Sequence, residues 1–291
     1  MRTLTLTLGL LLAGCASAQG EPMAVSPPPP AQTSEAATPP APLQYLYGSA
    51  EAAIAVRATY ARIADYAASR ITQRPQDSVI LTAEASMDAP RFEPCGDKPY
   101  AAVFDADETL IWNLGSMRWF AERGIGFDPK IWDEWERTGA GKAVAMPGSV
   151  ELVNALRAAG ITVIANTNRS AANAKGSEDT LRAAGLGEFR HGETLFLRGD
   201  DAGGSSKDLR RATIASRYCV IIMAGDQLGD FSQQFNERSL PAASRMKLAT
   251  GPAASALWDN GWFLFPNPVY GPWESLGWDD TFTTGSKWEP N

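Results

Sequence analysis

Positive charge and histidine are both scarce in this chain. Its 291 residues include 26 lysines and arginines against 33 aspartates and glutamates, which gives a net charge of -7 at pH 7. A protein with this balance does not grip polymeric nucleic acid or an anionic membrane by bulk electrostatics, so any phosphate-bearing ligand needs a local positive site. The single histidine excludes chemistry that needs a second histidine beside the first. Hydrophobic residues make up 44% of the chain, enough to bury one sizeable core or two modest ones.

An apolar segment near the start, Leu4 to Leu12, is too short to cross a bilayer as a helix. It follows a short positive start and ends in the small-residue sequence L-A-G-C, in which the cysteine is Cys15. Residues 1–14 therefore resemble a bacterial lipoprotein signal, whose cleavage exposes the cysteine to lipidation and so to membrane anchoring. Ala16 favours the outer membrane of the cell envelope. The alternative is an ordinary secretory signal that happens to contain this cysteine.

Residues 15–43 form a predicted linker. The tract from Ser26 to Pro42 contains seven prolines and almost nothing that can pack, which indicates an extended, semi-rigid spacer between anchor and folded part. A proline-rich docking ligand is the alternative use. Residues 44–291 are the predicted folded part.

Strands and helices alternate along the folded part. An alanine-rich helix is predicted over about Ser49 to Ser69, and later helices pass through Val150 to Leu156, end at Gly185, and run from about Ser206 to Arg217. Between them lie four apolar runs suited to a sheet that is buried on both faces. This alternation predicts an α/β fold with a parallel sheet and right-handed crossovers. The predicted strands are Tyr100 to Asp105, Ile161 to Thr167, Thr194 to Leu197 and Tyr218 to Asp226.

Three of the four predicted strands end on a reactive polar residue: Asp105, Thr167 and Asp226. In open parallel sheets ligands bind beyond the carboxyl ends of the strands, so these side chains are expected at one edge. Each can also be explained as the N-cap of the next helix. Three such residues at one sheet edge, with further carboxylates at Asp107 and Asp230, would repel one another at a cost in stability unless a cation lies among them.

These residue types suit phosphoryl transfer. The Asp105 carboxylate can attack phosphorus, and Asp107, two residues on along an extended segment, can reach the leaving oxygen as general acid. Thr167 offers a hydroxyl and Lys207 a cation to the phosphoryl oxygens. Short acidic side chains suit Mg²⁺, which neutralises the acids at this edge.

Four ordered motifs resemble those of the haloacid dehalogenase superfamily, and more narrowly those of the class C acid phosphatases, an outer-membrane lipoprotein branch that includes nucleotide phosphatases. The resemblance extends from about Tyr45 to Glu274 and also includes W-D-E-W, M-P-G-S-V-E-L and N-P-V-Y-G-P-W-E. The motifs are D-A-D-E-T at Asp105 to Thr109, T-N-R at Thr167 to Arg169, S-S-K-D-L-R-R at Ser205 to Arg211 and G-D-Q-L-G-D-F at Gly225 to Phe231.

The resemblance implies roles for particular residues. It gives Asp105 as nucleophile, Asp107 as acid and then base, and three phosphate ligands: Thr167, Asn168 and Lys207. It implies Mg²⁺ held by Asp105, the backbone carbonyl of Asp107 and Asp226, with Asp230 as a further metal-site residue that either binds the ion or lies beside its ligands. It also implies an aromatic slot for the leaving group, to which Trp132 and Tyr270 contribute, although core packing explains Trp132 equally well.

The fold implied by the resemblance is a three-layer, Rossmann-like parallel sheet. Its core is expected over about 98–250, with a small, mostly helical subdomain from about 44–97 and 251–291. Some positions depart from the family pattern: Ala106, Trp112 and Asn166. Trp112 lies close to the expected pocket, which leaves the preferred leaving group open.

The two cysteines other than Cys15 form an even pair. Cys95 and Cys219 lie just before or at the start of the first and fourth strands, which are neighbours in the fold that the resemblance implies. A disulfide and a buried free thiol at Cys219 are both open.

A rival motif, R-H-G-E-T at Arg190 to Thr194, opens the sequences of histidine phosphatases. Their chemistry needs a second histidine, so His191 is interpreted as a loop residue. The sequence therefore predicts a Mg²⁺-dependent acid phosphatase of the cell envelope, a nucleotidase that hydrolyses small phosphomonoesters such as nucleoside monophosphates. The alternatives are a non-catalytic surface lipoprotein or binding module that keeps the fold, and a phosphotransferase.

Overall fold

The computed structural model describes residues 38–237, 240–282 and 288–290. The predicted signal peptide, Cys15 and the proline-rich tract up to residue 37 lie outside the described residues. Among the helices that are described, none has both the length and the apolar character needed to cross a bilayer. Helical structure begins with α1 (Ala41–Leu43) and the π-helix η1 (Gln44–Gly48), slightly before the predicted start of the folded part at residue 44.

A five-stranded sheet lies at the centre of the fold, and each neighbouring pair of its strands runs parallel. Four of these strands are the ones predicted from apolar runs, and their side chains are largely buried. The fifth, at the edge beside β8, is absent from the prediction. In order across the sheet they are β7 (Leu195–Arg198), β6 (Thr162–Ser170), β3 (Tyr100–Phe104), β8 (Cys219–Gly225) and β9 (Trp262–Leu264).

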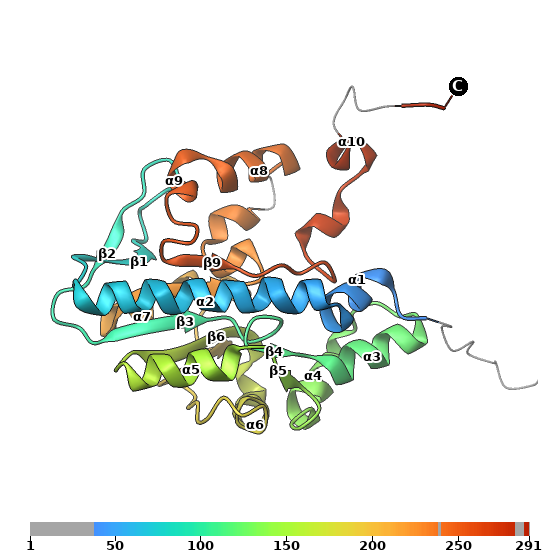
Figure 1. Cartoon of the computed structure of the whole chain (residues 1–291), viewed down its shortest axis with the longest axis horizontal. Coiled ribbons are helices and arrows are strands. Elements are labelled where there is room, and N and C mark those ends of the chain that lie inside the picture. Colours follow the sequence, from blue (N-terminus) through green and yellow to red (C-terminus); the bar gives the residue numbers. More distant parts are fainter. Residues whose placement is uncertain (1–37, 238–239, 283–287, 291) are drawn as a thin grey trace, which may run out of the picture. The chain divides into compact units, whose positions relative to one another are not determined.

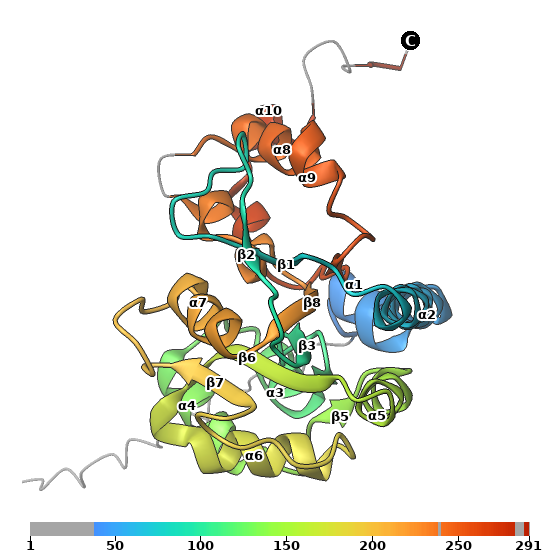
Figure 2. The same cartoon turned by 90° about the vertical axis from the view of Figure 1, so that its left-hand side faces the viewer.

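Helices cover both faces of the sheet, because successive side chains of each strand enter two different cores. Ala102 and Phe104 of β3 pack in one core with α2, α5 and α6, whereas Ala101 and Val103 pack in the other with α7 and aromatic residues of the C-terminal part. Figure 2 shows the sheet between α7 on one side and α5 and α6 on the other. The predicted three-layer α/β fold is confirmed. The helices are α2 (Ala50–Thr72), α5 (Ser149–Ala158), α6 (Ala174–Ala183) and α7 (Asp208–Arg217).

Local signals fix the ends of several helices. The hydroxyl of Ser49 accepts the Ala52 N–H at 3.0 Å, which caps α2 at the position where the sequence predicts its start. Gly160 follows α5 with φ at +77°, a conformation that residues with a Cβ rarely adopt. The long α2 packs on α5, and Figure 1 shows it running across the sheet.

The remaining elements are short. The segment between β3 and α5 starts at the carboxyl end of β3 and contains two helices and one pair of antiparallel strands. Two parts of the predicted subdomain, α2 and β9, belong to the main layers, and its boundary remains a prediction. The elements are β1 (Asp77–Leu81) with β2 (Phe92–Pro94), β4 (Ile111–Trp112) with β5 (Val144–Ala145), α3 (Leu114–Arg123), α4 (Pro129–Thr138), α8 (Ala242–Thr250), α9 (Pro252–Ser255) and α10 (Trp278–Thr281), with short 3₁₀ turns η2 (Ala171–Asn173), η3 (Leu228–Asp230), η4 (Gln233–Asn236) and η5 (Pro272–Ser275).

Candidate active site

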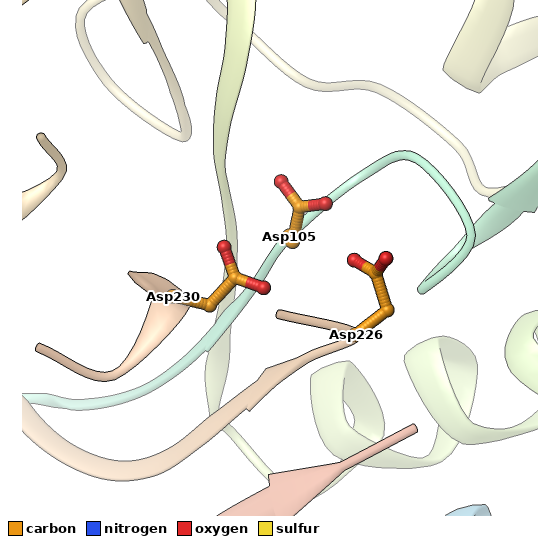
Figure 3. A group of neighbouring side chains, drawn as sticks. All are labelled: Asp105, Asp226 and Asp230. Carbon is orange, nitrogen blue, oxygen red and sulfur yellow. The ribbon is translucent and has the colours of Figure 1, made fainter. Parts of the chain in front are cut away.

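Three carboxyl groups meet at the carboxyl edge of the sheet. Asp105 directly follows β3 and Asp226 directly follows the neighbouring strand β8, and the Asp105 N–H donates to the Ala224 carbonyl at 2.8 Å. Asp230 stands in the next turn, η3. One oxygen from each of these three aspartates lies within 4.8 Å of the others, and Figure 3 shows the groups gathered around a common space. The structure brings these predicted residues together as expected from parallel strand ends.

Gly225 makes room for Asp230 in this cluster. A Cβ at position 225 would lie 2.2 Å from Oδ2 of Asp230, far inside ordinary contact. The same Oδ2 accepts the Gln227 N–H at 2.9 Å, so the turn holds the carboxylate against the end of β8. Asp226 is fixed in turn by the side-chain amide of Asn267, which donates to its Oδ2 at 2.7 Å.

Lys207, the residue before α7, supplies positive charge to the cluster. Its Nζ lies 2.5 Å from Asp105 Oδ1 and 2.7 Å from Asp230 Oδ1, and its side chain is 5% exposed. Burial raises the pKa of Asp105 well above its usual value; Lys207 opposes this shift, and the neighbouring acids add to it. Burial and the charge of Asp230 raise the pKa of Asp226 to about 7. The three carboxylates of the cluster therefore carry more negative charge than Lys207 can balance, which favours the binding of a further cation.

Asp107 is held by Arg169, a residue for which the sequence motifs gave no role. The guanidinium donates from Nη2 at 2.7 Å and from Nε at 3.0 Å to the same Asp107 oxygen, and Asn113 donates to it at 2.8 Å. Burial alone raises the pKa of Asp107, but the charge and hydrogen bonds of Arg169, with that of Asn113, hold it below its usual value. Nη1 of Arg169 is buried and has no hydrogen-bond partner within the part of the chain that is described.

The segment with Thr167 departs from the predicted strand end. Strand β6 continues to Ser170, although its pairing with β3 stops at Ala165 and its register with β7 shifts after Asn166. Thr167 nonetheless lies beyond the end of the β3 pairing, and its Oγ1 is 3.4 Å from Asp107 Oδ2. The alternation of side chains along a strand places Arg169 on the same side as Thr167, but only the structure shows that the strand continues that far.

Asn168, predicted as a phosphate ligand, has an exposed side chain whose two polar atoms are already bonded. Its Nδ2 donates to the Ser205 carbonyl at 3.0 Å, and its Oδ1 accepts from Arg210 at 2.7 Å. The side chain thus ties its loop to the segment before α7. Its role toward phosphate remains a prediction.

Glu108 links the segment after β3 to residues near both ends of the described chain. It is fully buried at a positive φ of 51°, and its carboxylate accepts from the hydroxyls of Tyr270 at 2.5 Å and Tyr47 at 3.0 Å. Burial, with the charge of Asp107, raises the pKa of Glu108 to about 7. Tyr270, predicted as part of an aromatic slot, is therefore bonded beside the site. The ring centroid of Trp132, the other predicted slot residue, lies 6.0 Å from Arg169 Cζ.

A family profile described as HAD superfamily, subfamily IIIB (acid phosphatase), matches residues 41–273, most of the chain. The chain belongs to this acid phosphatase family. Phosphatases of the HAD superfamily generally use a divalent metal, and the three aspartates at the sheet edge form an acidic cluster that can hold one.

Solved structures show the same fold. The class C acid phosphatase from Bacillus anthracis with tungstate bound superposes with a TM-score of 0.64 at 20% identity, over 84% of this chain and 90% of that chain. A second structure of that protein gives a TM-score of 0.63 at 21% identity, over 84% and 89%. At these identities the likeness establishes the HAD-type α/β fold.

A curated relative matches over a shorter stretch. Acid phosphatase 1 from Solanum lycopersicum is 28% identical over 150 residues, which are 48% of this chain and 56% of that protein. The chain thus spans about half the length of the curated relative it matches.

This HAD family member carries a disulfide between Cys95 and Cys219. The bond joins the start of β8 to the segment before β3, so it fastens the two strands whose far ends carry Asp226 and Asp105. Of the two alternatives left open by the sequence, the disulfide is the one that the structure contains. His191 lies 2.7 Å from Asp200 on an exposed turn and is not among the residues around the carboxyl cluster.

Proposed function

We propose that this chain is a Mg²⁺-dependent phosphomonoesterase that hydrolyses small phosphate esters, nucleoside monophosphates among them, through an aspartyl-phosphate on Asp105. The observation that carries the proposal is the buried carboxyl cluster at the sheet edge, with oxygens within 4.8 Å of one another and Lys207 bridging two of its members. Membership of an acid phosphatase family supports the reaction class.

The cluster suits a hard divalent cation, because its donors are carboxylate oxygens, which Mg²⁺ prefers. Burial and the neighbouring acids raise the pKa values of Asp105 and Asp226, so a cation among them would stabilise their charged forms. In our proposal Asp105, Asp226, Asp230 and the backbone carbonyl of Asp107 hold the ion. When bound, Mg²⁺ neutralises the carboxylates and the phosphoryl oxygens that approach them.

The donors around the cluster suit a phosphate group. Lys207 lies beside the proposed nucleophile, Thr167 offers its hydroxyl from β6, and Nη1 of Arg169 is a buried donor without a partner in the described structure. Together they provide hydrogen bonds to oxygens whose charge has to be balanced while phosphorus is transferred. The tungstate in the Bacillus anthracis structure is a tetrahedral oxyanion like phosphate, which makes tungstate a suitable probe of this chain.

The chain's own residues account for the two chemical steps. An Asp105 oxygen forms a bond to phosphorus while the bond from phosphorus to the leaving alcohol oxygen breaks, and protonated Asp107 gives that oxygen its proton. Because Arg169 and Asn113 hold the pKa of Asp107 below its usual value, this step is favoured at acid pH. Asp107 then takes a proton from water as the water oxygen attacks phosphorus, and the bond to Asp105 breaks to release inorganic phosphate. The hydrogen bonds from Arg169 and Asn113 fix the direction of the Asp107 carboxyl group for both transfers.

The leaving group has aromatic and apolar surroundings. Trp132 beside Arg169 and Tyr270 beside Glu108 are the proposed walls of a slot in which a base or aryl ring can stack. A cleft of about 1020 Å³ has Leu114 and Tyr47 in its lining, and the Tyr47 hydroxyl bonds the same Glu108 as Tyr270. We retain nucleoside monophosphates as the proposed substrate class on this basis.

The proposed location is the bacterial cell envelope, with Cys15 lipidated and the protein anchored in the outer membrane. Support for it comes from the sequence of residues 1–14, which lie outside the described residues. The Cys95–Cys219 disulfide fits an oxidising compartment of this kind.

The test is hydrolysis of a panel of nucleoside monophosphates, p-nitrophenyl phosphate and glycerol phosphate by the purified chain. We expect release of inorganic phosphate that EDTA abolishes and Mg²⁺ restores, and an Asp105→Asn variant that is at least about a thousandfold slower. Asp88→Asn, at an exposed aspartate between β1 and β2, is the matched control and should match the wild type.

Equal turnover by the Asp105 variant would exclude the carboxylate mechanism, and activity indifferent to EDTA would exclude the metal. Transfer of phosphate to an added alcohol in place of release to water would identify a phosphotransferase.

A further inference from the structure

Two adjacent arginines on α7 are buried beside the active site without touching the carboxyl cluster directly. Arg210 is 1% exposed and Arg211 is 3% exposed. Buried guanidinium groups are costly unless their donors are satisfied. Most of the acceptors here are backbone carbonyls of segments that carry proposed site residues, while Nε of Arg210 has no hydrogen-bond partner among the described residues. The two side chains reach different loops.

Arg210 holds the phosphate side. Its Nη1 donates to the Thr167 carbonyl at 2.5 Å, and its Nη2 donates to Asn168 Oδ1 at 2.7 Å and to the Ser206 carbonyl at 3.0 Å. One guanidinium therefore ties the β6 segment that carries Thr167 to the residue that precedes Lys207. The distance between the two proposed phosphate ligands depends on this fork.

Arg211 holds the metal side. Its Nη1 donates to the carbonyls of Asp230 at 2.6 Å and of Gly229 at 3.1 Å, and its Nη2 pairs with Asp208 in the first turn of α7. The turn that presents the Asp230 carboxylate is thus fixed to the helix that follows Lys207. Loss of this contact frees the turn and leaves the β6 segment in place.

We propose that Arg210 and Arg211 are positioning residues with separate tasks: Arg210 sets the geometry of the phosphate-binding loop, and Arg211 sets the position of the metal-binding Asp230. The proposal rests on the proposed phosphatase function. Lysine keeps the charge at either position but lacks the planar fork that reaches two carbonyls at once. Arg210→Lys and Arg211→Lys therefore test the geometry and keep the charge.

Two measurements separate the tasks. One is the inhibition constant of inorganic phosphate at saturating Mg²⁺, and the other is the affinity for Mg²⁺ alone, measured by calorimetry without substrate. For Arg210→Lys we expect phosphate inhibition weakened about tenfold and Mg²⁺ affinity within about twofold of the wild type. For Arg211→Lys we expect Mg²⁺ affinity lowered by about ten- to a hundredfold and phosphate inhibition within about twofold.

Arg157→Lys is the matched control. Arg157 is a helix arginine on α5 whose Nη1 and Nη2 donate to the carbonyls of Leu186 and Glu188 at 2.5 and 3.3 Å, and this loop carries no proposed site residue. Its replacement should leave both constants unchanged, whatever it does to the free energy of unfolding. If either α7 variant fails to fold, a milder variant at a partly exposed position replaces it. Asp201→Asn removes the carboxylate near Arg210, and Asp208→Asn removes the carboxylate paired with Arg211. We expect Asp201→Asn to affect phosphate inhibition and Asp208→Asn to affect Mg²⁺ affinity.

Equal effects of both α7 variants on both constants, or effects no larger than those of the control, would overturn the inference. Failure of the proposed function looks different, because the wild type would then hydrolyse no phosphate ester. An active wild type whose variants lack the division would refute only the separate tasks of the two arginines.

Discussion

Gly225→Ala is expected to disturb the metal side of the cluster without removing any polar group. The added methyl carbon would lie 2.2 Å from Asp230 Oδ2 and 2.5 Å from its Cβ and Cγ, whereas ordinary contact starts at 3.4 Å. Asp230 must therefore recede by roughly 1 Å, which lengthens its 2.7 Å contact with Lys207 and its 2.9 Å hydrogen bond from Gln227. Each hydrogen bond to a charged group contributes about 1.5–3 kcal/mol.

A displaced ligand of this kind typically lowers metal affinity by about ten- to a hundredfold. We expect the Mg²⁺ concentration for half-maximal hydrolysis of p-nitrophenyl phosphate to rise by that factor, with activity recovered in part at high Mg²⁺. The control is Gly126→Ala, because a Cβ at Gly126 meets no atom within 4 Å. A Gly225→Ala enzyme with the Mg²⁺ requirement of the wild type would refute the placement of Asp230 in the metal site.

Three other changes test separate parts of the structure. Replacing both Cys95 and Cys219 by alanine should lower the free energy of unfolding by up to about 5 kcal/mol, because the disulfide closes a loop with a sequence separation of 124. Denaturant titration of the wild type, with and without reductant, and of the variant measures this loss. An unchanged unfolding midpoint would contradict it. Arg169→Gln should lower kcat/KM by about a hundredfold, because the carboxyl group of Asp107, the proposed general acid, loses the ion pair that orients it. Arg137→Gln, on the exposed face of α4, should change kcat/KM less than twofold. The pKa of Glu108 is raised to about 7, so the folded protein keeps the carboxyl proton of Glu108 to a higher pH than the unfolded chain does, and the stability of the metal-free protein should fall as pH rises from about 4.5 to 7. Glu108→Gln should flatten the dependence of Tm on pH over this range. An identical slope in the variant would show that Glu108 does not titrate between these pH values.

The positions of the carboxylates could be predicted because they depend on local patterns. Apolar runs identify β3 and β8, and the topology of parallel sheets then brings the residues after them, Asp105 and Asp226, to one edge. Thr167 lies beyond the end of the pairing with β3, but it is not the strand end that the sequence predicts, because β6 continues to Ser170 through a shift in register that the apolar pattern does not reveal.

Other features depend on contacts between distant segments. Strand β9 has only three residues, Trp262–Leu264, which is too short a run to show a periodicity in the sequence. These residues form a strand because they pair with the edge of β8. Glu108 joins Tyr47 and Tyr270 across 61 and 162 residues, and nothing in the local sequence marks them as partners. Arg169 belongs with them, because its place beside Thr167 depends on the continuation of β6 beyond the predicted strand end.

The central claim is that the Asp105 carboxylate becomes bonded to phosphorus. Acid quenching during turnover of p-nitrophenyl phosphate, reduction with borohydride and mass spectrometry of the peptides test it directly, because reduction converts an aspartyl-phosphate to homoserine. The account predicts homoserine at position 105, formed only with substrate and Mg²⁺ together. Robust turnover with unmodified aspartate at position 105, or with homoserine at another position, would contradict it.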